Sequence, residues 1–599
     1  MSAVVVEHEV SCKSSVHDLW NVLTDTSYLN RLSGEAPRHI TPIDGTNGAR
    51  YRIRMRAGGF NVEWQEWPFE WVVEDHFRTL RLFDAGPVSS VDTLLTFSPD
   101  AAGGGARVVI RLELMPKLSW LRFIIRLGAR KAADALATAV RKIDAALVQR
   151  RPLPLPPKAP PAPAMATAEA AHERATARLR GEASPALADR LSTFVAQGRD
   201  EELARIRPFA LAAEWGVDRR ELLATCLQAV RVGLLELRWE VICPSCRVGA
   251  EVVSTLSAVK GHATCHLCEI AFGLELDEAL EATFAPTPAV RRIDVAQYCV
   301  GGPSRTPHVL AQAALPARGR VKLPVPATAG RYRLFVRGGA MRALELTADA
   351  PADVEVTLDD ATPARVQPGG HVTIVSNFAD ERHVKLERVV TETLAASARE
   401  VTAMPGFRRD FAAEILRPDL ALKVSTVTLF FSDLTASTQL YADVGDAPAL
   451  KLVHDHFDLV LAILSKHGGT LVKTIGDAVM AAFNDDLDAV AASLEALTAF
   501  EKFRLEAPNG ERTHLKLGVY RGPSYLVTAN GVLDYFGQTV NIAARLQAQA
   551  NSGELVIEQT LADAAVRAGR LPATAVRERY RASLKGVAEP IDVCRVVAT

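Results

Sequence analysis

A proline-rich segment interrupts the chain after its first 150 residues. It reads RPLPLPPKAPPAPA from residue 151 and contains seven prolines between Pro152 and Pro163. Proline fixes φ and removes a backbone donor, so this segment suits neither a helix interior nor a central strand. We predict an extended linker over residues 151–166 and a domain boundary there. A chain of 599 residues also exceeds what one hydrophobic core supports, so several domains are expected.

Charge and hydropathy restrict the class of protein. Lys and Arg number 69 against 70 Asp and Glu, so no global field would recruit nucleic acid or an anionic membrane. No apolar run reaches the roughly 18 residues that a membrane span requires. The N-terminal residues lack the basic-then-apolar order of a signal peptide. We therefore expect a cytoplasmic protein with no membrane span and no nucleic-acid partner.

Residues 1–150 alternate apolar and polar positions in short runs, such as YRIRMRA at 51–57 and RVVIRLEL at 107–114. Two short helical patterns follow the first run, and a long amphipathic pattern covers 121–149. This order resembles the START-like, polyketide-cyclase-like superfamily. The resemblance implies a helix-grip domain with a cavity for an apolar small-molecule ligand. An aromatase-type or cyclase-type enzyme is the alternative, but His8, His17 and Asp18 are expected to be surface or capping residues.

Residues 167–240 are predicted to be helical, ending in ELLATCLQAVRVGLLELRWEV. Within them, LAAEWGVDRRELLATCLQAV has the pattern of a helix–turn–helix, with the turn at residues 215–217. Phosphate contacts need a basic surface, and this segment carries acids as well as bases. A helical packing module is therefore favoured over DNA binding.

Two C-x-x-C pairs lie in residues 241–278, separated by 18 residues. Two such pairs can place four thiolates around one Zn²⁺ and leave no position for water. Four reduced thiols in a core are the alternative, but they would not explain the paired spacing. We predict a zinc ribbon with one structural Zn²⁺, whose ligands are Cys243, Cys246, Cys265 and Cys268. The remaining cysteines are expected to be small buried side chains: Cys12, Cys226, Cys299 and Cys594.

Short apolar runs with Gly and Pro between them return over residues 279–385 and predict a small β-sandwich. Residues 386–422 are predicted to be a helical connector into the last domain.

The final segment, residues 423–599, places polar side chains at the ends of apolar strands. STVTLFFSDLTAST (425–438) predicts a strand that ends at Asp433, followed by a loop and a helix. LVKTIGDAVMAAF (471–483) predicts two strands joined at a Gly turn, with Asp477 at the tip. The helix after residue 537 places Asn541 and Arg545 on one face. Each feature alone has a simpler explanation, because strand-end acids often cap helices and Lys473 could form a local ion pair with Asp477.

Together these motifs resemble the class III adenylyl/guanylyl cyclase catalytic domain, and they occur in the family's order. The resemblance implies a ferredoxin-like α/β domain that binds two Mg²⁺ or Mn²⁺ ions through two carboxylates. It also implies contacts to the ribose, the α-phosphate and the terminal phosphates, and a loop of backbone amides around the triphosphate. The two metal-binding carboxylates match Asp433 and Asp477. The contacts to the ribose, the α-phosphate and the terminal phosphates match Asn541, Arg545 and Lys585, in that order. The loop around the triphosphate matches residues 434–438, with Leu434, Thr435 and Thr438.

The same resemblance assigns the purine contacts to Lys473 and Asp534. Lysine only donates hydrogen bonds and an ionised aspartate only accepts them. Adenine presents an acceptor at N1 and a donor at its 6-amino group, whereas guanine presents the reverse. The pair therefore favours ATP over GTP. The predicted activity is conversion of ATP to 3′,5′-cyclic AMP and pyrophosphate.

In the family the active site lies between two catalytic domains, so a homodimer is implied. Asp477 of one chain would serve one site and Lys473 of the same chain the other. The order of helices, zinc ribbon and β region also resembles an uncharacterised module upstream of bacterial cyclase domains, and we expect the upstream domains to regulate activity. Two departures from the family pattern are Ala436, where glycine is usual, and Tyr520, where histidine is common. The alternatives are a guanylate cyclase and a catalytically silent sensor or scaffold.

Overall fold

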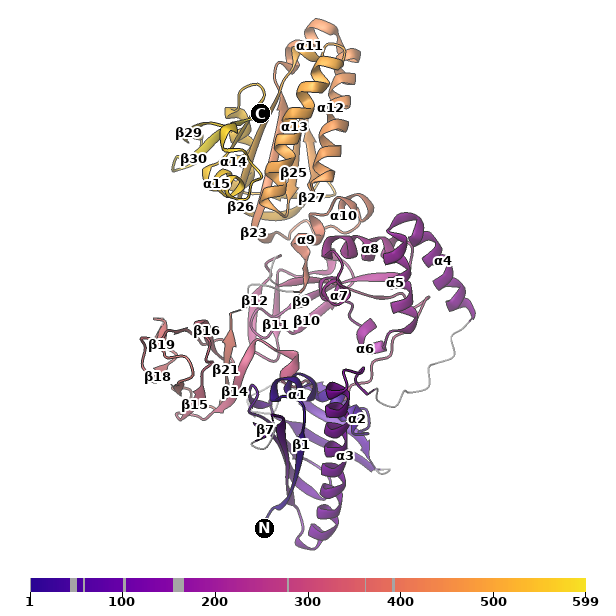
Figure 1. The fold of residues 1–599 in the computed structure, drawn as a ribbon, viewed down its shortest axis with the longest axis vertical. Helices are drawn as coiled ribbons and strands as arrows, with labels where there is room; N and C mark the ends of the chain where they lie inside the picture. The colour runs from indigo at the N-terminus through magenta and orange to yellow at the C-terminus, as the bar shows by residue number, and fades with distance from the viewer. Residues whose placement is uncertain are drawn as a thin grey trace.

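The computed structural model describes residues 2–43, 51–57, 60–100, 104–154, 166–276, 279–360, 362–389 and 394–598. The molecule is elongated, with the N-terminal domain at one end and the C-terminal domain at the other (Figure 1). A helical module and a β-rich region lie between them. No helix in the described ranges is both long enough and apolar enough to cross a membrane.

The N-terminal domain has the predicted order of a strand, two helices, a sheet and a long helix. Ser15 and Asp25 cap the two short helices by accepting backbone N–H groups. The long helix packs on the sheet through a stripe of buried residues at helical spacing, Ile125, Ala129, Ala133, Ala137 and Val140. The elements are β1 (Val4–Cys12), α1 (Val16–Leu23), α2 (Thr26–Leu32), β2 (His39–Pro42), β3 (Tyr51–Ala57), β4 (Phe60–Glu66), β5 (Glu70–Val72), β6 (His76–Phe83), β7 (Val88–Pro99), β8 (Ala106–Pro116) and α3 (Arg122–Val148).

The N-terminal sheet does not end within its own domain. Its strand β5 pairs with β14 (Val309–Leu315), so the sheet continues into the β-rich region as β5-β14-β21. Side chains reinforce this junction. The indole of Trp71 donates to the carbonyl of Val309 at 3.1 Å, and the amide of Gln312 donates to the carbonyl of Phe69 at 2.5 Å. The predicted linker lies mainly outside the described residues.

The middle module begins with helices, as predicted, but its last part is a strand. The prediction of helix up to residue 240 is wrong, because Gly233 takes a left-handed φ of +83° and stops the helix. The following sequence LELRWEVI pairs with β10 and β13. The elements are α4 (Ala166–Glu182), α5 (Pro185–Gln197), α6 (Asp200–Leu203), α7 (Pro208–Trp215), α8 (Arg219–Arg231), β9 (Leu235–Ile242), β10 (Gly249–Val253), β11 (His262–Cys265), β12 (Ile270–Gly273) and β13 (Leu280–Pro286).

The predicted helix–turn–helix geometry is present, with Gly216 at φ +66° between α7 and α8. Its second helix also packs against α4, α5 and β9. Arg220 on α8 pairs with Asp488 of the C-terminal domain at 2.9 Å. The helix therefore packs between domains, as the favoured interpretation expected.

The β-rich region contains two sheets that share one hydrophobic core, as expected for a small sandwich. Its predicted start at residue 279 is too early, because β13 pairs with β9 of the middle module. One sheet continues from β14 through β21, β16, β17 and β19, and the other is β15-β20-β18. The further strands are β15 (Arg320–Pro324), β16 (Gly330–Val336), β17 (Met341–Leu346), β18 (Asp353–Thr357), β19 (Ala364–Val366), β20 (His371–Val375) and β21 (Arg382–Arg388).

The predicted connector over residues 386–422 is only partly helical. Its first residues belong to β21, and β22 (Ala396–Ser397) pairs with β13. Two short helices follow, α9 (Ala398–Thr402) and α10 (Pro405–Asp410). Proline begins α10, where its missing N–H costs nothing. The predicted helical connector is therefore present only as two short helices.

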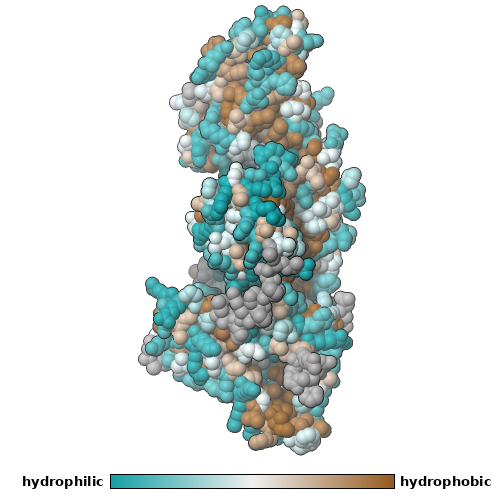
Figure 2. All heavy atoms as spheres, turned by 90° about the vertical axis from the view of Figure 1, so that its right-hand side faces the viewer, coloured by the Kyte–Doolittle hydropathy of each residue, from teal (hydrophilic) through white to brown (hydrophobic). Residues whose placement is uncertain are grey.

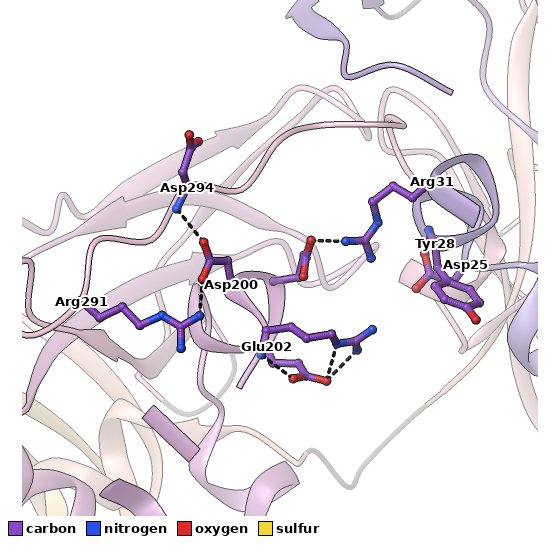
Figure 3. A network of polar contacts seen from close by, with 9 residues as sticks. Asp25, Tyr28, Arg31, Asp200, Glu202, Arg291 and Asp294 are labelled. Atoms are coloured by element: carbon purple, nitrogen blue, oxygen red, sulfur yellow. Dashed lines mark hydrogen bonds and ion pairs between the residues drawn. The ribbon is translucent and has the colours of Figure 1, made fainter. Parts of the chain in front are cut away.

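Polar contacts join α2 of the N-terminal domain to the middle module (Figure 3). Arg31 on α2 pairs with Glu201 on α6. Asp200, the residue before Glu201, accepts from Arg291 at 2.6 Å and from the backbone N–H of Asp294. These contacts therefore link the N-terminal domain to the helices and to the irregular segment that leads toward the β-rich region.

The C-terminal domain has one mixed sheet in the order β24-β25-β23-β26-β28-β30-β29, with β27 on β26. Alternate residues of β23 face opposite sides, so Phe430 packs in the core with α12 and α13, and Phe431 packs in the core with α14. The elements are β23 (Leu422–Leu434), α11 (Ser437–Val444), α12 (Asp446–Lys466), β24 (Thr470–Ile475), β25 (Ala478–Phe483), α13 (Asp486–Glu506), β26 (Leu515–Ala529), β27 (Val532–Phe536), α14 (Gln538–Gln549), β28 (Glu554–Glu558), α15 (Gln559–Arg567), β29 (Val576–Ala582) and β30 (Ile591–Val597).

Candidate active site

Asp433 lies at the end of β23, as predicted, and its carboxylate is held from two directions. It stands opposite Lys516 in the register of β23 and β26. The ammonium of Lys516 is 2.9 Å from Asp433 Oδ2, and the side-chain amide of Gln547 on α14 donates to the same atom at 3.3 Å. Neither contact was predicted from the sequence. Lys516 could have been found only by aligning the two strands, since nothing local links it to Asp433.

Asp477 lies in the turn between β24 and β25, after Gly476 with its φ of +63°. Its Oδ2 atom is buried, and no hydrogen-bond partner for it is found among the residues described. An unpaired buried carboxylate oxygen is costly unless something else binds it. Hard divalent cations such as Mg²⁺ prefer oxygen ligands of this kind. The residues present therefore fit a cation site.

Both carboxylates act on one buried imidazole. Burial lowers the pKa of His456 on α12, against the opposing effects of its hydrogen bond to Val453 and of the charges of Asp477 and Asp433. Ser432, the residue before Asp433, pairs with Val479 on β25, two residues after Asp477. Asp433 at the end of β23 and Asp477 in the turn before β25 therefore lie at the same end of two neighbouring strands.

Lys473 does not pair with Asp477. Its ammonium is 2.6 Å from Asp534 Oδ2, although 61 residues separate them in the sequence. Asp534 is only 7% exposed, and its other oxygen accepts the backbone N–H of Tyr535 at 2.8 Å. The structure thus brings together the two residues that were assigned to the purine.

Asn541 and Arg545 lie on α14, which packs closely on β26 because Gly518 faces it. A Cβ on Gly518 would lie 2.2 Å from the backbone nitrogen of Gln547. Gln547 faces the sheet and reaches Asp433, whereas Arg545, two positions earlier, is rotated by about 200° around the helix. Within the described ranges, no hydrogen bond or ion pair is found for the side chains of Asn541 and Arg545. The thickness of α14 therefore separates Arg545 from Asp433 of the same chain.

Lys585 lies in the loop between β29 and β30 and is exposed. The next residue, Gly586, adopts φ +75°, and a Cβ there would lie 3.5 Å from Nη1 of Arg545. This loop therefore runs beside the guanidinium. Two cations predicted to contact phosphates, Arg545 and Lys585, are brought to one side of α14.

The loop after β23 was predicted to bind the triphosphate through its backbone amides, but not all of its polar groups are free to do so. The backbone N–H of Thr435 donates to the carbonyl of His514 at 2.8 Å, and its hydroxyl accepts from the N–H of His514. These groups of Thr435 are thus used within the protein. Ala436, at the usual glycine position, has a left-handed φ of +59°. An L side chain in that region is strained by about 1 kcal/mol.

The four predicted zinc ligands form a second cluster. Their sulfur atoms lie within 4.8 Å of one another, and all four residues are buried. Hydrogen bonds from the other three thiols, together with Lys385, hold the pKa of Cys268 below its ordinary value. The Nζ atom of Lys385 on β21 is 3.5 Å from Cys268 Sγ. The cluster is compatible with zinc. The other four cysteines are buried, as expected.

Two family models match the chain. Residues 421–591 match the adenylate and guanylate cyclase catalytic domain, and residues 169–299 match a family of unknown function, DUF5939. Guanylate cyclase 2G of Mus musculus is 27% identical over 260 residues, which cover 39% of this chain and 23% of that protein. Adenylate cyclase of Lachancea kluyveri is 30% identical over 163 residues, covering 24% of this chain and 9% of that protein. The chain thus spans less than a quarter of either relative.

Solved structures give a similar result. The adenylyl cyclase CyaB from P. aeruginosa has 21% sequence identity and a TM-score of 0.26, and covers 30% of this chain and 97% of its own. The guanylyl cyclase Cya2 has 21% identity and a TM-score of 0.26, and covers 28% of this chain and 91% of its own. Proteins named for either nucleotide are therefore present among the similar proteins.

Proposed function

Because residues 421–591 belong to the adenylate and guanylate cyclase catalytic domain family, we propose that this protein is an adenylate cyclase. In the proposed reaction the ribose 3′-oxygen of ATP attacks the α-phosphorus, and the bond to pyrophosphate breaks. Cyclic AMP and pyrophosphate are the products.

The contact between Lys473 and Asp534 carries the choice of ATP. The ammonium can donate to N1 of adenine, and the carboxylate can accept from the 6-amino group. Guanine would set its N1–H against the ammonium and its 6-oxo group against the carboxylate. Asp534 is buried, so such a mismatch would leave polar groups without partners. Guanylate cyclase is the alternative, and the names of several similar proteins favour it.

Asp433 and Asp477 are the proposed ligands of two divalent cations. When bound there, Mg²⁺ or Mn²⁺ would activate the ribose hydroxyl and neutralise charge on the triphosphate. Lys516 and Gln547 hold the carboxylate of Asp433 in position. The ammonium of Lys516 is also close enough to that carboxylate to interact with a triphosphate held beside it. This lysine is a positioning residue that the motifs did not identify.

The position of α14 supports a site built from two chains. Asp433 lies on the sheet side of the helix, and Arg545 lies on the other side. A second copy of the chain can supply Arg545 to the α-phosphate, Asn541 to the ribose and Lys585 to the terminal phosphates. A two-fold dimer would form two equivalent sites in this way.

Product formation tests the proposed reaction. The purified full-length protein is given ATP or GTP with Mn²⁺, with an Asp433→Ala variant in parallel. We expect cyclic AMP from ATP, little product from GTP, and neither product from the variant. Cyclic GMP as the main product would make the protein a guanylate cyclase. No product from either nucleotide would favour the silent scaffold, and undiminished activity of the variant would contradict the metal assignment.

Mixing two inactive variants tests the two-chain site. Asp433→Ala and Arg545→Ala each destroy both sites of a homodimer. A heterodimer of the two keeps one intact site, because both substitutions fall in the other site. An equal mixture with exchanged subunits should recover about a quarter of the wild-type rate. No recovery, with heterodimers verified by mass spectrometry, would contradict this arrangement.

We also propose that the N-terminal domain binds a small, largely apolar ligand. A cavity of about 180 Å³ lies between the sheet, α2 and α3, and leucine and phenylalanine side chains line much of it. Thr79 in its wall is buried, and its hydroxyl has no partner among the described residues. On α2, Thr26 and Asn30 line the cavity and also donate to Cys299 and Tyr298. Native mass spectrometry and a thermal-shift ligand screen test this, and failure of both would contradict it.

A further inference from the structure

We infer that the beginning of α3 docks the protein on an anionic lipid surface. Large apolar side chains are exposed there: Trp120 is 70% exposed, Phe123 80% and Leu127 63%. Leu118 and Ile124 beside them are also more than half exposed. A contiguous exposed group of this kind on a globular domain marks a contact surface.

These side chains are not needed to hold the helix on its sheet. Phe123, Ile124 and Leu127 follow the spacing of one face of α3, and Trp120 lies in the short 3-10 helix Ser119–Leu121 directly before it. Ile125, Ala129 and Ala133 form the buried stripe on the opposite face. The first turns of α3 are therefore apolar on both sides. From Arg130 onward the exposed side becomes polar, so the apolar face is confined to one end of the helix.

Positive charge surrounds this apolar face. Between Glu113 and Asp134 the sequence contains no acid and five cations, Lys117, Arg122, Arg126, Arg130 and Lys131. Within the described residues, no ion pair is found for the last four of these cations. Two of the nearby acids have other partners, because Glu113 pairs with Arg111 and Asp134 contacts His8. The Asp84 carboxylate accepts from the neutral amide of Gln65 and keeps its charge. Lys117 donates to the backbone carbonyl of Asp84.

The combination of charge and apolar surface selects the partner. A second copy of this chain, placed on the same face by a two-fold axis, would set cations against cations. Nucleic acid would satisfy the cations but would leave the aliphatic side chains in water. An anionic bilayer takes the apolar side chains into its interface and attracts the cations to its headgroups. Tryptophan is favoured at that depth.

The position of the surface suits this role. Figure 2 shows hydrophobic atoms gathered at the end of the molecule where α3 begins in Figure 1. The catalytic domain lies at the opposite end (Figure 1). Docking through the start of α3 therefore leaves the candidate active site away from the lipid.

Vesicle flotation of the full-length protein tests the inference. Vesicles of phosphatidylcholine alone are compared with vesicles that also contain one quarter phosphatidylglycerol. Flotation is expected with the anionic vesicles only, and it should weaken at high salt because the charge attraction is screened. The variant Trp120→Glu/Phe123→Glu should lose at least tenfold in affinity. Leu505→Glu/Met341→Glu makes the same charge change at two exposed apolar residues elsewhere and should bind like the wild type.

Three results would overturn the inference: no flotation with anionic vesicles, equal flotation of the Trp120 and Phe123 variant, or equal loss in the control variant. A self-association that the same variant abolishes, without lipid binding, would identify a second copy of the chain as the partner. Circular dichroism and cyclase activity of each variant establish that it is folded. Charge removal alone, by Arg126→Gln/Arg130→Gln/Lys131→Gln, should reduce the salt dependence of flotation.

Discussion

The two ends of the molecule carry opposite kinds of side chain that have no partner among the described residues. At the C-terminal end these groups are polar, namely the buried Oδ2 atom of Asp477 and the side chains of Asn541, Arg545 and Lys585. At the start of α3 they are apolar, with cations around them. Polar groups without partners suit a charged nucleotide, and an apolar face with cations suits an anionic lipid surface. The chemistry of the unused groups therefore indicates the partner at each end.

The largest expected effect is loss of activity when Asp477 is replaced by asparagine. Its buried Oδ2 atom makes no hydrogen bond to any residue that the structure describes, so Asp477→Asn should leave the thermal unfolding temperature unchanged or raise it. The rate of product formation should fall about 10³-fold, roughly 4 kcal/mol of transition-state stabilisation. Asp486→Asn is the matched control, because Asp486 is held by Thr428 and Arg521. Asp486→Asn should lower the unfolding temperature and largely preserve the rate of product formation. A stable but inactive Asp486→Asn, together with an unstable but active Asp477→Asn, would contradict the roles given to these two residues.

We predict that a zinc ion held by the four cysteines stabilises the region between the two ends. Metal binding to four buried cysteines contributes directly to folding, so a strong chelator should remove several kcal/mol of stability. Elemental analysis should find one zinc per chain, and calorimetry should show an earlier unfolding transition after chelation. Cys265→Ser should reproduce both results. A protein without zinc and with an unchanged unfolding profile would restore the alternative of four reduced thiols.

The preference for ATP or GTP tests the contact between Lys473 and Asp534 in the C-terminal domain. Lys473→Glu replaces a donor by an acceptor beside Asp534, so the ratio of activity with ATP to activity with GTP should fall at least tenfold. Lys502→Glu makes the same charge change on the exposed face of α13 and should keep the ratio. An unchanged ratio in Lys473→Glu would show that Lys473 and Asp534 do not select the purine.

Acid should destabilise the catalytic domain through His456. Burial lowers its pKa in the folded protein, so the unfolded chain binds more protons once the pH falls below about 6.5, its unfolded pKa. The stability that neutral His456 allows is fully present above that pH. It is lost as the pH falls toward the pKa of His456 in the folded protein. His456→Asn should flatten the pH dependence of the free energy of unfolding over this range. An equal slope in both proteins would assign the acid sensitivity to other groups.

The smallest effect concerns Ala436. Its left-handed φ strains an alanine but not a glycine, so Ala436→Gly should stabilise the domain by up to about 1 kcal/mol. Chemical denaturation measures this change. Ala436→Val is the comparison at the same position, and it should destabilise the domain because a branched side chain fits that region even less well. Equal stability of all three proteins would show that the strain is relieved elsewhere.

Most of the candidate active site could be predicted because its residues follow local patterns. Asp433 and Asp477 end apolar strands, and Asn541 and Arg545 share a helix face, so each is visible in a short segment. The pairing of Asp433 with Lys516 depends on the register of two strands 83 residues apart, and no short pattern encodes it. The contact of Lys473 with Asp534 was reached through the family resemblance and not through any local signal.

The fold was predictable where periodicity was clear and failed where it was ambiguous. The run after Gly233 has apolar residues that fit both a helix and a strand, and only its pairing with two other strands decided between them. Net charge describes the whole chain and not a local surface. A total close to zero coexists with five cations and no acid between Glu113 and Asp134, at the start of α3.

The pairing of β5 with β14 has a consequence for synthesis of the chain. The residues that complete the edge of the N-terminal sheet come about 240 positions later, since Phe69 bonds to Gln312. During translation the edge of β5 that later pairs with β14 therefore stays unpaired until the whole helical module and the cysteine cluster have emerged from the ribosome. Exposed strand edges favour aggregation, and closing so long a loop is slow. The sheet of the N-terminal domain is thus completed only after the helical module and the cysteine cluster have been synthesised.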